Sequence, residues 1–164
     1  MKMNIRPLLP SEWEMFRHLR LHALQSAPGV FESTYAEAIT RTEADWRALL
    51  SPERQQVFGL FDGEKLIGIS AVFTSRDDAA TAQLVMHFIL PEYRGQKLSR
   101  LFYEAGLDWA RSRNTFRRVI VAARASNAAS NAAMRAAGFK PTHRETQIWP
   151  DGATEDEIWY ELRL

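Results

Sequence analysis

The stretch that decides the fold runs from Leu84 to Arg113 and reads LVMHFILPEYRGQKLSRLFYEAGLDWARSR. It opens with an apolar run, beginning at about residue 82, that Pro91 interrupts, as expected of a strand and its end. A short basic turn follows. The remainder carries apolar residues at helical spacing, which predicts a helix over 97–113 packed by one face: Leu98, Leu101, Phe102, Ala105 and Trp109.

Working outward, the rest of the chain alternates between strand and helix patterns. Ser11 with Glu14 resembles a capping box that opens a helix, and Thr42 is placed to cap another. The strand patterns cover 3–8, 57–61, 66–73, 82–90, 119–123, 142–149 and 157–162, and the other helical patterns cover 11–27, 33–50 in two pieces and 127–137. This order predicts an α/β fold, a mixed sheet flanked by about four helices.

Length and composition narrow the possible classes. The chain has 164 residues, which suits a single domain over 1–164, and its 46% hydrophobic and 25% charged residues are typical of globular proteins. The absence of cysteine excludes disulfides and thiolate metal sites, and no apolar run is long enough for a secretory signal or a membrane span. The net charge of +1 offers no general attraction for nucleic acid. We therefore expect a cytoplasmic protein with neither a nucleic-acid nor a membrane partner.

The basic turn is the best candidate for an anion site. Free N–H groups at a helix start and the positive end of the helix dipole bind phosphate. Arg94, Lys97 and Arg100 add positive charge there, although a solvated basic loop would look the same. The chain contains neither a P-loop nor a Gly-x-Gly-x-x-Gly fingerprint, which disfavours a nucleotide hydrolase and a Rossmann dehydrogenase.

The turn resembles the acetyl-CoA-binding motif of the GNAT superfamily of N-acetyltransferases, which reads Arg/Gln-x-x-Gly-x-Gly/Ala. The similarity covers Leu90–Ser99 and continues with Arg124-Ala125-Ser126-Asn127 and with Gly138-Phe139 after an alanine-rich helix. The resemblance implies a mostly antiparallel sheet of six to seven strands that splays between its fourth and fifth strands. It also implies acetyl-CoA as cosubstrate, no metal, a small-molecule or peptide amine as acceptor and a possible homodimer.

The same resemblance implies a cofactor site. The pantetheine arm would bond to the fourth strand at 87–89, and the pyrophosphate would sit on the N–H groups of 95–100. Two family glycines are replaced here by Lys97 and Ser99, so we expect altered rather than abolished binding. Asn127 would contact the arm and could also cap the next helix. The implied cofactor residues are His87, Phe88, Ile89, Arg94, Gly95, Gln96, Lys97, Leu98, Ser99, Arg100, Asn127 and Ser130.

The catalytic residues of the family do not carry over. Its two alternative base positions hold Gln83 and Ala122, and its tyrosine acid position holds Met134. We expect His87 to act as base, because histidine titrates in the right range, and Ser130 to serve as acid or hydrogen-bond donor to the thiolate. A core or edge histidine and a helix-surface serine are the structural alternatives.

The acceptor pocket is expected around Arg20, Glu32 and Tyr35, with the loop 149–154 nearby; Glu32 and Tyr35 are also weaker candidates for the base. Two hypotheses without turnover remain open beside the N-acetyltransferase. They are a catalytically silent CoA-binding module and an interaction domain on the same fold.

Overall fold

The computed structural model describes residues 2–164, and in them the strands form one seven-stranded sheet ordered β1-β2-β3-β4-β5-β7-β6. Every neighbouring pair is antiparallel except β4 with β5, so the predicted fold class is confirmed. The strands are β1 (Met3–Pro7), β2 (Gln56–Asp62), β3 (Lys65–Thr74), β4 (Thr81–Ile89), β5 (Arg118–Arg124), β6 (Lys140–Ile148) and β7 (Thr154–Arg163).

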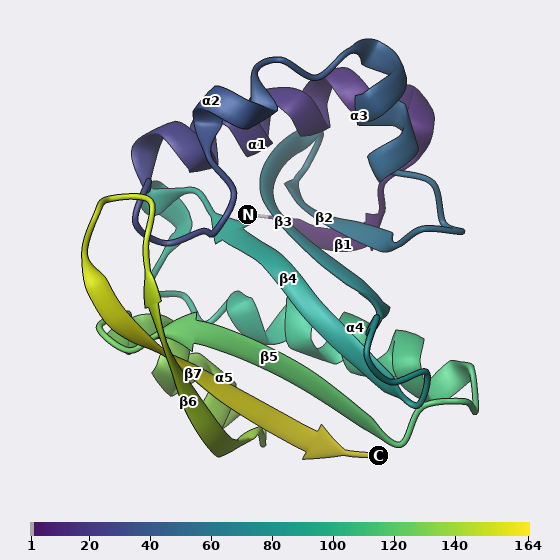
Figure 1. The fold of residues 1–164 in the computed structure, drawn as a ribbon. Helices are drawn as coiled ribbons and strands as arrows, with labels where there is room; N and C mark the ends of the chain where they lie inside the picture. Colours follow the sequence, from purple (N-terminus) through teal and green to yellow (C-terminus); the bar gives the residue numbers. More distant parts are fainter. Residues whose placement is uncertain (1) are drawn as a thin grey trace.

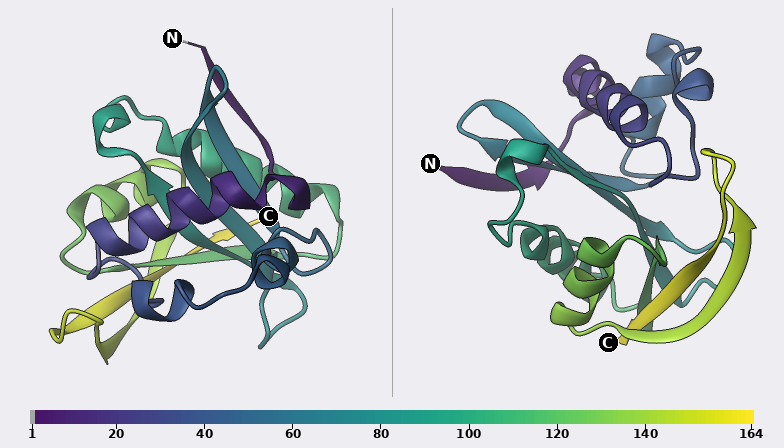
Figure 2. Two further views of the ribbon diagram at one scale, coloured as in Figure 1. Left: turned by 90° about the horizontal axis from the view of Figure 1, so that it is seen from above. Right: turned by 90° about the vertical axis from the view of Figure 1, so that its left-hand side faces the viewer.

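Helices cover both faces of this sheet (Figures 1 and 2). One face carries α1 (Trp13–Ser26), α2 (Tyr35–Ala38) and α3 (Glu43–Leu49), and the other carries α4 (Ser99–Ser112) and α5 (Ala128–Ala136). Within residues 2–164 the α-helices thus number five rather than about four, because the predicted region 33–50 does split in two. None of the helices in this part of the chain combines the length and apolarity needed to cross a membrane.

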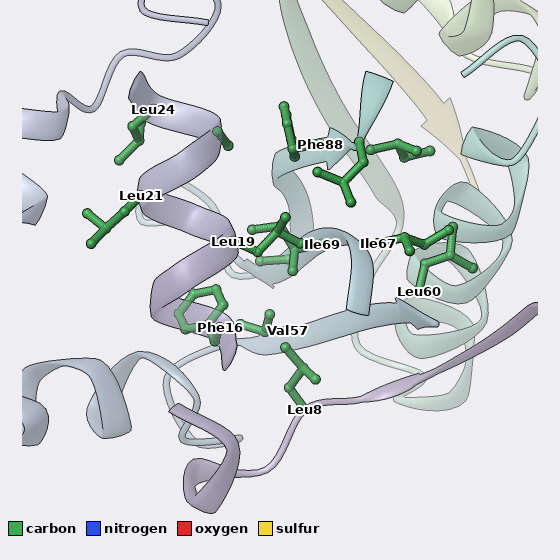
Figure 3. Packing of buried hydrophobic residues seen from close by; sticks show 14 of the residues in the cluster. Leu8, Phe16, Leu19, Leu21, Leu24, Val57, Leu60, Ile67, Ile69 and Phe88 are labelled. Atoms are coloured by element: carbon green, nitrogen blue, oxygen red, sulfur yellow. The ribbon is translucent and has the colours of Figure 1, made fainter. Parts of the chain in front are cut away.

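Two hydrophobic clusters hold the layers together. The first lies between α1 and the strands β2 and β3, where Phe16 and Leu19 of the helix meet Val57 and Ile69 of the sheet (Figure 3). These side chains are at most 4% exposed, so the face of α1 on which they recur is fully removed from water. The second cluster joins β5 and β7 to α4 and α5.

Helix starts agree with one capping prediction and contradict the other. The Thr42 hydroxyl accepts from the Asp45 N–H at 3.2 Å, and the Asp45 carboxylate accepts from the Thr42 N–H at 2.8 Å. Ser11, by contrast, does not cap α1. Glu12 accepts from the Leu9 N–H at 2.9 Å and pairs with Arg6 at 2.8 Å, which closes a 3₁₀ turn before α1 begins at Trp13.

The predicted splay between the fourth and fifth strands is present, and a β-bulge accompanies it. β4 and β5 pair only over three residues each, 81–83 with 118–120. Further along β4, Met86 and His87 together oppose the single residue Ser70 of β3, and Met86 has a φ of +65°. An extra residue bends the strand that contains it. β4 therefore turns away from β5 and leaves a gap at their carboxyl ends.

Candidate active site

A cavity of about 80 Å³ lies in the gap between β4 and β5. We call it the cleft. Its walls come from both strands, from α4 and α5, and from the loop after α1, including His87, Tyr103, Ala122, Asn127, Ser130 and Phe31. The cleft thus brings together three residues that the sequence predicts in a site, His87, Asn127 and Ser130. In an open α/β sheet, ligands bind at this edge, beyond the carboxyl ends of the strands.

The basic turn joins β4 to α4 beside the cleft. Among residues 2–164, none of the backbone N–H groups of Gly95 to Arg100 donates a hydrogen bond. Gly95 and Lys97 have φ values of +81° and +59°, so Lys97 adopts the left-handed conformation that glycine takes most easily. This conformation accounts for the family preference for glycine at that position.

The charged side chains of the turn are partly engaged. The Arg94 Nε donates to the Ile89 carbonyl at 2.9 Å, and its guanidinium lies 5.3 Å from the centre of the Phe88 ring. Arg100 forms an exposed ion pair with Glu104 at 3.4 Å. The backbone N–H groups of the turn, which have no partner, are therefore better candidates for holding an anion than these partly engaged arginines.

His87 lies beneath the start of α4. Its Nε2 is 3.2 Å from the Ser99 Oγ, and its ring stacks on Tyr103 with centroids 5.3 Å apart. Burial lowers the pKa of His87 to about 4, so the ring is neutral near pH 7. The bulge places this ring on the α4 side of the sheet, where it supports the turn. That geometry favours a positioning role over proton abstraction from an amine.

Asn127 and Ser130 sit at the start of α5. The Asn127 Oδ1 accepts from the Ser130 N–H at 3.2 Å, which confirms the expected capping role. Asn131, which the sequence analysis did not single out, holds the start of α5 against the end of β5. Its Nδ2 donates to the carbonyls of Arg124 at 3.0 Å and Asn127 at 2.8 Å, and its Oδ1 accepts from the Tyr160 hydroxyl at 2.7 Å.

Tyr103 was also missed by sequence reasoning. Its side chain is 3% exposed, lines the cleft and stacks on His87. Burial raises the pKa of its hydroxyl well above the usual tyrosine value, so the hydroxyl keeps its proton. The only indication in the sequence was that Tyr103 falls on the buried face of the predicted helix. A core residue with no role in the site would occupy the same position.

The three residues expected around the acceptor pocket have different surroundings. Arg20 is 5% exposed, and its guanidinium lies 4.8 Å from the ring centre of Phe31 in the cleft wall. Its Nε and Nη1 have no hydrogen-bond partner among residues 2–164, and burial lowers its pKa to about 10. Tyr35 packs against the first hydrophobic cluster and is not part of the cleft wall.

Glu32 borders a second cavity, of about 370 Å³, together with 147–150 at the start of the predicted tail loop. Figure 1 shows why: the yellow turn between β6 and β7 reaches up to the loop after α1. Arg124 links the β6–β7 turn to the loop after α1, because it donates to the Gly29 carbonyl at 2.8 Å and pairs with Asp151 at 2.7 Å.

The structure adds a carboxylate that the sequence reasoning did not consider, Glu157 of β7. It is 8% exposed and lies opposite Arg124 of β5 in the strand register. Burial, and then the carboxylate of Glu32, raise the pKa of Glu157 to about 7. Little in the sequence singles out Glu157. Glu155, Glu157 and Glu161 lie at even spacings on the same face of the strand, a pattern that is equally typical of a face exposed to solvent.

Within the described residues, no cluster of three or more histidine, aspartate or glutamate side chains could hold a metal ion.

The overall shape is shared with solved acetyltransferases. A GNAT-family acetyltransferase from Streptococcus pneumoniae superimposes with a TM-score of 0.84 at 18% identity, over 99% of this chain and 100% of that one. The putative acetyltransferase YncA from Salmonella typhimurium, solved with acetyl-CoA, gives 0.83 at 18% identity over 100% and 95%. The ribosomal-protein-S5-alanine acetyltransferase from Vibrio fischeri gives 0.82 at 16% identity over 99% and 93%.

Comparison with curated proteins finds no match to the sequence. The model of the acetyltransferase (GNAT) family, however, matches residues 13–139, a span that runs from the start of α1 to the second residue after the C-cap of α5 and includes the whole cleft and basic turn. The chain therefore belongs to the acetyltransferase (GNAT) family.

Proposed function

We propose that this protein transfers the acetyl group of acetyl-CoA to a primary amine by direct attack in a ternary complex. The observation that carries the proposal is the cleft between β4 and β5, which ends at a turn with six consecutive unbonded N–H groups. The N–H groups of 95–100 would hold the pyrophosphate. The β4 backbone, which has no β5 partner after Gln83, would hydrogen-bond the pantetheine arm.

The solved relatives support this choice of cosubstrate. YncA was solved with its cofactor acetyl-CoA, and the ribosomal L7/L12 acetyltransferase RimL was solved with coenzyme A. Their identities to this chain are 18% and 16%, so they show the fold, and the cosubstrate is inferred from the fit of the turn and the cleft.

The chemistry needs few groups, because the thioester is already activated. A neutral amine attacks the carbonyl carbon, the C–N bond forms, the C–S bond breaks, and the thiolate takes a proton. We expect the hydroxyl of Tyr103 or Ser130, both of which line the cleft, to donate this proton and to recover one from the attacking nitrogen, so that the nitrogen proton ends on the thiol. Positioning and a polarising N–H donor can supply much of the remaining rate enhancement.

A catalytically silent CoA-binding domain is the second candidate, and the observation that favours it is Ala122 in the cleft wall where many relatives carry a glutamate base. Both candidates predict that acetyl-CoA stabilises the fold, by about 2.7 kcal/mol at a hundred times its Kd. A thermal-shift titration tests this, and no shift at millimolar acetyl-CoA contradicts both.

Release of free thiol from acetyl-CoA, followed over a panel of small amines, amino acids and peptides, then separates the two candidates. An amine-dependent signal supports the transferase, and a flat response to every amine supports the silent domain. Lys97→Gln, matched by Lys140→Gln on an exposed strand, reports whether the signal depends on the turn. If backbone donors dominate, Lys97→Gln raises the Kd of acetyl-CoA only a few-fold and lowers its salt dependence.

A further inference from the structure

Glu157 lies on the same face of the sheet as the cleft residue Ala122. Ala122 opposes Trp159 and Arg124 opposes Glu157 in the antiparallel register of β5 and β7. Alternate residues of a strand share a face, so all four side chains project from one face, on which α1 and α2 lie. Diagonal neighbours across such a pair are about 7–8 Å apart, within reach of a long side chain. Ala122 has only a methyl group and lines the cleft, so its side chain does not extend toward Glu157.

Glu157 has no cationic partner within residues 2–164. Arg124, the nearest arginine in the register, pairs with Asp151 at 2.7 Å and with Glu155 at 2.8 Å. Within residues 2–164, Glu157 itself takes part in no ion pair. The groups that face it are the carboxylates of Glu32 and Glu145 and the amide of Gln147, which comes from β6.

A carboxylate that is 8% exposed and surrounded by other carboxylates is costly to maintain. Such groups concentrate at functional sites, where a perturbed acid performs chemistry. Glu32 and Gln147, the two neighbours whose side chains reach Glu157, both border the cavity of about 370 Å³, so a ligand in that cavity would meet Glu32 first and Glu157 behind it. An ammonium group would supply the missing positive charge at Glu157 and Glu32.

We propose that Glu157, with Glu32 beside it, binds the ammonium group of the acceptor and removes its proton before attack on the thioester. This inference rests on the proposed function. Glu157 as carboxylate takes one proton from R–NH₃⁺ and becomes a neutral acid. R–NH₂ then forms the C–N bond, the C–S bond breaks, and the second nitrogen proton reaches the thiolate as CoA-SH. Glu157 then passes its proton to water by way of Glu32, which borders the second cavity, and this restores the carboxylate.

The pH dependence of turnover follows from this assignment. Glu157 must be ionised to accept a proton, so kcat in the wild-type protein rises as the pH passes through its pKa of about 7. Glu32 and Glu145 oppose ionisation of Glu157, whereas Arg124, already paired twice, does little to favour it. Replacing Glu32 by Gln removes one opposing charge and moves the rise in kcat to lower pH.

The test uses the best amine from the thiol-release panel and four variants. Glu157→Gln is expected to lower kcat by about 100-fold or more at pH 7, because a general base contributes about 10²–10⁴ in rate. Its Kd for acetyl-CoA should stay within about twofold of wild type, and its activity should keep rising with pH as free amine accumulates. Glu157→Asp should retain the rise near pH 7 at lower kcat. Glu64→Gln, the same change at an exposed turn, is the matched control.

The outcomes separate the two proposals. A Glu157→Gln protein whose kcat stays within about threefold of wild type, or whose pH profile is unchanged, overturns this inference and leaves the transferase intact. Wild-type protein that binds acetyl-CoA but releases no thiol with any amine overturns both. If Glu157→Gln does not fold, Glu32→Gln decides the matter. Glu32 is exposed, and a pH profile that does not move in that variant contradicts the proposed pair.

Discussion

Replacing Glu157 by Gln should stabilise the protein by an amount that grows as the pH rises from about 4.5 to about 7. In the unfolded chain this carboxyl titrates at the usual glutamate value of 4.5, whereas burial and Glu32 raise its folded-state pKa to about 7. Between these values the folded protein holds a proton that the unfolded chain has released. The free energy of unfolding therefore falls as the pH rises from 4.5 to 7 and is constant above that. Glutamine, which does not titrate, removes this pH-dependent loss.

The size of the effect follows from the same interval. At 1.36 kcal/mol per pH unit, the span from 4.5 to about 7 sets an upper limit of about 3 kcal/mol. Glu157 lies beside Glu32, which borders the open second cavity, and solvent there weakens the electrostatic effect, so we expect about 2 kcal/mol at pH 8 and close to zero at pH 4.5. For a chain of this length, that corresponds to a rise in Tm of about 4–8 °C.

Urea unfolding of wild type, Glu157→Gln and the surface control Glu64→Gln at pH 4.5, 6, 7 and 8 measures this difference directly. The stability gain should appear with rising pH in the Glu157 variant alone. Equal stability differences at pH 4.5 and pH 8, or a less stable variant at pH 8, would refute the reasoning. Together with the kinetic test, this result would show a residue that lowers stability while supporting turnover.

Further variants probe the turn and its supports. His87→Gln should make the free energy of unfolding less sensitive to acid. Burial lowers the pKa of His87 from 6.5 to about 4, so wild type loses stability as the pH falls through this range, and a glutamine does not titrate there. Urea midpoints measured between pH 6.5 and 4 test this. Lys97→Gly should raise the free energy of unfolding by up to about 1 kcal/mol, since φ is +59° there; no gain in a urea melt contradicts this. In Gly106→Ala the new Cβ would lie 2.5 Å from a Leu84 methyl, so a loss of about 1–2 kcal/mol and weaker acetyl-CoA binding by calorimetry are expected. Asn131→Asp replaces a donor that faces two main-chain carbonyls with an acceptor, so it should lower the free energy of unfolding by about 3 kcal/mol or more in thermal melts. A near-neutral effect would argue that Asn131 does not hold α5 to β5.

Local patterns predicted most of the fold because periodicity and turn residues act over short distances. Thr42 caps its helix as its spacing with Asp45 indicated. The Ser11 prediction was wrong because Arg6, five residues earlier, holds Glu12 in a competing turn that no short motif reveals.

The sequence predicted the part of the site that consists of backbone donors in one turn. It predicted less well the parts that depend on contacts between segments far apart in the chain. The turn after Pro91 followed from a motif, whereas the orientation of His87 depends on an extra residue in β4 that hydrophobic alternation does not reveal. Glu157 and Glu32 lie far apart in the sequence and meet only because the β6–β7 turn folds over the loop after α1. Neither residue is unusual by type or spacing, so their pairing required the structure.

The bulge at Met86 makes the cleft depend on how many residues β4 contains and much less on which residues they are. Removing one residue there would bring β4 back into step with β3, straighten the strand and let it rejoin β5, which would close the space for an acyl carrier. The separation of the two strands is therefore expected to be more sensitive to deletion of one residue at the bulge than to most substitutions along β4.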